Sequence, residues 1–124
     1  MYLLRGSKLV QLTRDHTYVQ DLVDDGFLSP DEARFHPYRH ALTRALGINP
    51  DVEVDCAGGE LLAGDAFLLC TDGLTNEVSD PFIRDVMDAH RTEPEMCAHK
   101  LVAQALSNGG RDNVTVIAVA FAHG

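Results

Sequence analysis

The sequence lacks several features that mark common functional classes. Its 124 residues contain no tryptophan and 6% aromatic residues, and ten basic against nineteen acidic side chains give a formal net charge of −9. Nucleic acids and anionic membranes are bound by basic surfaces, so this balance argues against both as partners. No apolar run approaches the length of a membrane-spanning helix, and the residues after Met1 do not resemble a signal peptide. We therefore expect a cytoplasmic protein.

Cysteine is also scarce. Cys56, Cys70 and Cys97 are odd in number and widely spaced, and each lies among apolar residues. A disulfide framework or a zinc site requires paired or closely spaced cysteines. We therefore expect three reduced thiols in the core.

The most informative stretch is a short apolar run that ends just before Asp72. Residues 66–70 are all apolar and follow a Gly-Asp turn signal, which predicts a strand buried on both faces. Asp112 precedes a second apolar run over 114–121. From the residue pattern alone, the two aspartates are either turn residues or ligands of one hard cation such as magnesium or manganese.

Local signals predict the remaining elements. Alternation and glycine turns predict a hairpin over 2–12 and a half-buried or edge strand over 52–56. The order of strands and helices, without regular βαβ alternation, indicates a layered α+β fold in which helices cover one face of a sheet and a second sheet covers the other. Capping residues followed by apolar stripes predict four helices, which begin near Thr17, Ser29, Ser79 and Thr92.

Five motifs follow one another along the chain: residues 2–6, residues 12–17, residues 36–47, Gly64-Asp65 with Cys70-Thr71-Asp72-Gly73-Leu74-Thr75, and Asn108-Gly109-Gly110-Arg111-Asp112-Asn113-Val114-Thr115. In this order they closely resemble the C-terminal half of a bacterial PP2C-type (PPM family) metal-dependent serine/threonine protein phosphatase. Each motif is weak by itself, and the ordered set is specific.

The resemblance implies that residues 1–124 form half of an αββα four-layer sandwich, with antiparallel sheets and flanking helices. It implies that Asp72 and Asp112 are catalytic through metal, as ligands in a centre of two or more Mn²⁺ or Mg²⁺ ions. There a metal-activated water attacks the phosphorus of phosphoserine or phosphothreonine. Thr71, Gly73 and Asn113 are implied to support the ligand loops.

The resemblance also assigns a flap, roughly residues 17–46, beside the active-site cleft. His36, Arg39 and Arg44 in or next to this segment are candidates to contact substrate or to order the flap, and a purely structural role is equally open for each. The implied partners are phosphoproteins, the substrates of serine/threonine kinases.

The family's N-terminal half has no counterpart in the sequence. Its phosphate-binding arginine, Glu-Asp metal pair and histidine-containing motif are unmatched, and two aspartates do not satisfy two six-coordinate ions. A first strand that begins at Tyr2 also suggests preceding sequence. We therefore expect a fragment with little or no activity that needs the missing half. The alternative is a non-catalytic, phosphatase-like module that binds a partner or self-associates through an uncovered apolar face.

Overall fold

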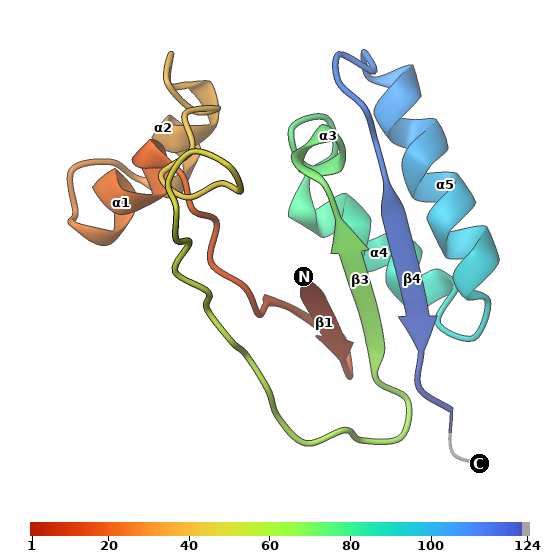
Figure 1. The fold of residues 1–124 in the computed structure, drawn as a ribbon. Helices are drawn as coiled ribbons and strands as arrows, with labels where there is room; N and C mark the ends of the chain where they lie inside the picture. Colours follow the sequence, from red (N-terminus) through yellow and green to blue (C-terminus); the bar gives the residue numbers. More distant parts are fainter. Residues whose placement is uncertain (123–124) are drawn as a thin grey trace. The chain divides into compact units, whose positions relative to one another are not determined.

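A computed structural model describes residues 1–122 of the chain, which divide into two compact units. The larger unit comprises residues 1–13 and the chain from residue 59 onward. It contains every strand and the longer helices (Figure 1). The smaller unit comprises residues 14–58. Among residues 1–122, no helix combines the length and the apolar character that crossing a bilayer requires.

The larger unit is built on a four-stranded antiparallel sheet with the strand order β2-β1-β3-β4. Its hairpin turns at Gly6, whose φ of 59° lies in the left-handed region that a tight two-residue turn requires. The predicted hairpin is therefore confirmed. The strands are β1 (Tyr2–Arg5), β2 (Lys8–Gln11), β3 (Ala66–Cys70) and β4 (Val116–Ala120).

Helices pack on one face of this sheet, as the predicted α+β fold requires (Figure 1). The core between them contains Leu4 and Leu68 from the strands and Ile83 and Leu101 from the helices, all with 0% exposure. Burying an aliphatic side chain of this size contributes roughly 1.5–3 kcal/mol. The helices of this unit are α3 (Asp72–Thr75), α4 (Asp80–Ala89) and α5 (Pro94–Ser107).

The opposite face of the sheet is apolar and exposed. Residues paired directly across strands lie on the same face, and Phe67 pairs with Val119 while Leu69 pairs with Ile117. Leu69, Ile117 and Val119 are 39%, 56% and 43% exposed. The prediction that the strand over 66–70 is buried on both faces is therefore wrong for this chain, because the helices of the larger unit pack on one face of the sheet.

The smaller unit contains the helices α1 (Tyr18–Asp24) and α2 (Pro30–Phe35), which begin where their caps predict. The hydroxyl of Thr17 accepts a hydrogen bond from the Gln20 N–H. Ser29 and Glu32 form a reciprocal capping box, in which each side chain bonds the other's backbone N–H.

The strand predicted over 52–56 is not formed, and this segment is irregular and exposed. A strand needs a partner edge for its backbone hydrogen bonds. The contacts of this segment are made instead by the Asp55 carboxylate, with His16 and Arg44, and by Glu53, with Arg44. Cys56 lies in the same exposed stretch, so the prediction of a core thiol is wrong for it, whereas Cys70 is partly buried and Cys97 is buried.

One ion pair fastens β1 to the turn before β3. The Asp65 side chain is 1% exposed and binds Arg5 through two hydrogen bonds, Nε to Oδ1 at 2.9 Å and Nη2 to Oδ2 at 2.7 Å. The Leu62 N–H donates to Oδ2 at 2.9 Å, and Arg5 also donates to the Glu60 carbonyl at 2.8 Å. These donors, Arg5 first, lower the pKa of Asp65 to about 2.

Acid is expected to weaken the fold through Asp65. Because its pKa is lowered from 3.8 to about 2 in the fold, its stabilising effect is complete above the ordinary pKa and is lost as the pH falls through about 2. We expect Asp65→Asn to lower the free energy of unfolding at neutral pH and to reduce its dependence on pH across this acidic range. Urea denaturation at a series of pH values measures both effects. The control is Glu95→Gln, at a side chain that is 92% exposed; equal acid sensitivity of Asp65→Asn and the native chain would contradict the assignment.

Candidate functional site

Asp72 is the first residue of α3 and lies two positions after Cys70, the last residue of β3. Thr71 precedes it in an extended conformation, with φ −83° and ψ 167°, and Asp72 is exposed. The turn closes when the Asn76 N–H donates to the Asp72 carbonyl at 2.8 Å. The sequence predicted a glycine turn here, and the structure forms a single turn of helix. Four residues are too few to show a helical periodicity in the sequence.

Asp112 lies in the loop between α5 and β4, where it is exposed. Its Oδ1 accepts a hydrogen bond from the Asn113 N–H at 2.7 Å. The loop begins with two glycines at positive φ, 146° at Gly109 and 54° at Gly110, that end α5. The N–H groups of these glycines bond carbonyls of the last turn, in the Schellman pattern.

Hydrogen bonds from Thr71 bring the two aspartate-bearing segments together. Its N–H donates to the Thr115 carbonyl at 3.1 Å, and its hydroxyl donates to the Asn113 carbonyl at 3.3 Å. The same hydroxyl accepts from the Thr115 N–H at 3.2 Å. The contact therefore extends the β3–β4 pairing at the end of β3 where α3 begins (Figure 1). Asp72 lies in α3, and Asp112 lies in the loop that leads into β4.

Gly73 makes the closest approach between these segments. A Cβ atom at this position would lie 2.0 Å from the Asn113 carbonyl oxygen and 3.1 Å from Val114 Cγ2, so only glycine fits. Thr71, Gly73 and Asn113, which the resemblance assigned to supporting the ligand loops, thus all take part in one contact. Their role toward a cation stays a prediction.

The two carboxylates fit part of a site for a hard divalent cation. Carboxylate oxygens are the ligands that magnesium, manganese and calcium prefer, and such ions take six or more of them. Within residues 1–122, no group of three or more histidine, cysteine, aspartate or glutamate side chains is placed to hold a metal ion. Asp72 and Asp112 therefore supply two carboxylates of the type that such an ion takes, and their sharing of one cation stays a prediction.

Arg44, one of the predicted flap residues, is tied to the irregular segment of the smaller unit. Its Nη1 lies 2.8 Å from Asp55 Oδ1, and its Nη2 lies 3.7 Å from the Glu53 carboxylate. Asp55 also contacts the His16 ring, Nε2 to Oδ2 at 2.8 Å. These contacts, His16 first and then Arg44, lower the pKa of Asp55 to about 2. Arg44 therefore helps order this unit, and contact with substrate stays a prediction.

His36 and Arg39 also make their observed contacts inside the smaller unit. The His36 ring packs near Tyr18 and Tyr38, with centroid distances of 6.2 and 5.8 Å, and its Nδ1 accepts from the Tyr38 N–H at 3.1 Å. Arg39 donates to the His36 carbonyl at 3.2 Å. These contacts account for a structural role and leave the predicted substrate contacts untested.

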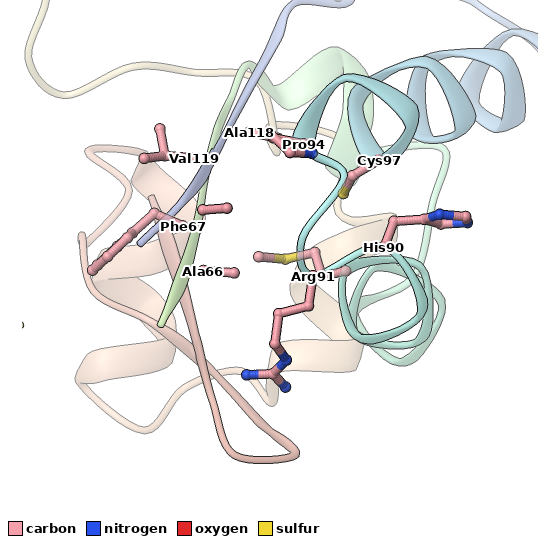
Figure 2. A pocket seen from close by; sticks show the side chains of 10 residues that line it. Ala66, Phe67, His90, Arg91, Pro94, Cys97, Ala118 and Val119 are labelled. Carbon is pink, nitrogen blue, oxygen red and sulfur yellow. The ribbon is translucent and has the colours of Figure 1, made fainter. Parts of the chain in front are cut away.

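A small pocket lies at the end of β3 and β4 remote from Asp72 and Asp112. In Figure 2, His90, Arg91 and Cys97 lie on the helix side of the strands, and Phe67 and Val119 lie on the other side. The Arg91 guanidinium donates to the carbonyl oxygens of Gly64 and Gly6 and to Asp88. The Arg91 guanidinium is therefore paired with the protein's own oxygens. The pocket lies between β3, β4 and the connection from α4 to α5, and we assign no ligand to it.

Comparison with known proteins gives consistent matches. The family profile described as Stage II sporulation protein E (SpoIIE) matches residues 25–122. The serine/threonine protein phosphatase PstP of Mycobacterium tuberculosis is 46% identical over 118 residues, which cover 94% of this chain and 22% of PstP.

Solved structures agree with the sequence matches. The PPM Ser-Thr phosphatase MsPP from Mycobacterium smegmatis, in complex with cacodylate, is 38% identical with a TM-score of 0.86, and the match covers 97% of this chain and 51% of that one. A PstP catalytic domain in complex with two manganese ions is 40% identical with a TM-score of 0.73, over 94% of this chain and 47% of that one. The chain thus spans about half of these crystallised chains.

The close approach at Gly73 predicts a specific sensitivity to side-chain size. Gly73→Ala is expected to lower the free energy of unfolding by about 1–3 kcal/mol, because the new Cβ would overlap the Asn113 carbonyl. Gly59→Ala is the matched control, since a Cβ there meets nothing within 4 Å. Its expected change is within about 0.5 kcal/mol. Chemical denaturation measures both variants, and equal stability of the two would contradict the contact.

Proposed function

Because this chain belongs to the SpoIIE/PP2C-type family of serine/threonine phosphatases, we propose that it is the C-terminal portion of a metal-dependent serine/threonine protein phosphatase domain. In the complete domain, Asp72 and Asp112 hold Mn²⁺ or Mg²⁺. Such ions polarise phosphoryl oxygens and activate water for hydrolysis. The proposed substrates are proteins that carry phosphoserine or phosphothreonine.

The contact between the Asp72 and Asp112 segments carries this proposal. Thr71 joins them through three hydrogen bonds, and Gly73 sets their spacing at the Asn113 backbone. A site whose ligands are held by backbone contacts at strand ends loses little conformational entropy when it binds a cation. The two manganese ions of the PstP catalytic domain support the choice of metal.

The proposal includes a second half of the domain. Two carboxylates leave most of a six-coordinate sphere unfilled. The exposed apolar row on the sheet, which includes Leu69, Ile117 and Val119, matches the inner face of a two-sheet sandwich. One further layer would supply the missing ligands and cover this row. Alone, the chain is therefore proposed to have little or no phosphatase activity.

Manganese binding tests the assignment of the ligands. Asp72→Asn and Asp112→Asn are each expected to weaken Mn²⁺ binding by at least about tenfold, the size of effect found even for outer-shell partners. The electron paramagnetic resonance signal of free Mn²⁺ measures the affinity. Asp85→Asn, an exposed carboxylate on α4 that pairs with Arg84, is the control. Unchanged affinity in both ligand variants would refute the metal site.

An activity assay tests the proposal that the chain alone is inactive because part of its metal site is missing. The chain with Mn²⁺ and p-nitrophenyl phosphate is expected to show almost no turnover. Robust turnover that Asp72→Ala abolishes would contradict this part of the proposal and leave the metal site intact.

The exposed apolar row favours one alternative, a non-catalytic module that binds a partner or self-associates. Light scattering distinguishes a self-associating module from a monomeric chain. The variant to compare is Ile117→Lys, because Ile117 is 56% exposed on that row. If this row mediates self-association, the chain forms an oligomer and Ile117→Lys restores a monomer. A native chain that is monomeric and binds little hydrophobic dye would contradict self-association.

A further inference from the structure

Glu77 follows α3, five positions after Asp72, and its side chain is 5% exposed. Removing a carboxylate from water costs free energy unless hydrogen bonds or an opposite charge compensate. The partners of Glu77 therefore indicate what its burial achieves. The sequence patterns give no signal for this residue, because a glutamate between a turn and a helix start is ordinary in composition.

The contacts of Glu77 converge on the loop that leads to Asp112. The Arg111 N–H donates to Glu77 Oε1 at 3.4 Å, and Arg111 Nη1 lies 3.5 Å from the same oxygen. The Asn108 side-chain amide donates to the Glu77 carbonyl at 2.8 Å. At Gly109, a Cβ would lie 3.2 Å from Glu77 Oε2, so the loop runs directly against this carboxylate.

The turn that carries Asp72 is therefore attached to the Asp112 loop at both of its ends. Thr71 forms the attachment before the turn, and Glu77 forms it after the turn. Asp112 directly follows Arg111, the residue that Glu77 binds through both backbone and side chain. A shift of this loop would move the Asp112 carboxylate relative to Asp72.

We propose that Glu77 is a positioning residue: together with Arg111 it fixes the loop that carries Asp112 relative to Asp72. The inference rests on the proposed function only for the statement that the two carboxylates share a cation. Glu77 itself does not coordinate the cation; its effect on metal affinity passes through Asp112. The competing explanation is that Glu77 and Arg111 stabilise the whole fold without any special effect on the loop.

Amide hydrogen exchange in the metal-free chain separates these explanations. In Glu77→Ala, the amides of Arg111, Asp112 and Asn113 are expected to exchange about tenfold faster, the order of effect of losing a hydrogen bond to a charged group. The amide of Leu68, in the centre of β3, is expected to change less than about twofold, since the effect is local. If the loop amides change no more than Leu68, the proposal is overturned.

Manganese affinity then tests the effect on the site. Glu77→Gln, which keeps the shape of the side chain and removes its charge, is expected to weaken Mn²⁺ binding about tenfold with the unfolding midpoint retained. Arg111→Gln is expected to do the same, and the double variant is expected to bind no more weakly than either single one, since the two residues act as a unit. Glu95→Gln, at a 92% exposed carboxylate on α5, is the control that leaves the affinity unchanged.

The two sets of measurements distinguish the possible failures. If the native chain binds Mn²⁺ and Asp72→Asn weakens the binding while the Glu77 variants bind as tightly as the native chain, the Glu77 proposal is overturned and the metal site stands. If no Mn²⁺ binding depends on Asp72, the metal site falls. The exchange rates of the Arg111–Asn113 amides then decide alone whether Glu77 fixes the loop.

Discussion

The close contact between Gly73 and the Asn113 backbone is the constraint on which the rest of the site depends. It joins two segments that lie about 40 positions apart in sequence, and the bond from the Thr71 hydroxyl to the same carbonyl fixes it in place. Because β3 and β4 are antiparallel neighbours, the end of β3 lies beside the start of β4. This backbone contact sets the positions of the Asp72 and Asp112 residues. In our proposal, Glu77 fixes the Asp112 loop through its contacts with Arg111.

The uncovered face of the sheet and the partial ligand set point to the same requirement. Covering a side chain such as Ile117 or Val119 is worth up to roughly 1.5–3 kcal/mol, and each filled ligand position adds to cation affinity. In the proposed complete domain, one layer meets both needs. Closing the core and assembling the metal centre are then a single event, so fold stability and metal affinity are thermodynamically linked.

Local sequence signals predict much of the fold, and each wrong prediction of an element has a physical cause. The hairpin at Gly6 and the helix starts at Thr17 and Ser29 were predictable because turn and cap signals lie within a few residues. The alternating residues 52–56 predicted a strand, yet a strand forms only where an edge is available to pair with it. The cap expected at Thr92 is at Glu93 instead, because Pro94 occupies the first helical position.

The placement of Asp72 and Asp112 at neighbouring strand ends was predictable from motifs, and their role toward a cation stays a prediction. The contact between Glu77 and Arg111 joins residues 34 positions apart, which no local pattern encodes. The most direct test of the central claim is an anomalous difference map from manganese-soaked crystals of the chain. The account predicts a manganese peak within about 2–2.5 Å of carboxylate oxygens of both aspartates. A structure in which the two carboxylates point to opposite sides of the molecule, with any manganese elsewhere, would contradict it.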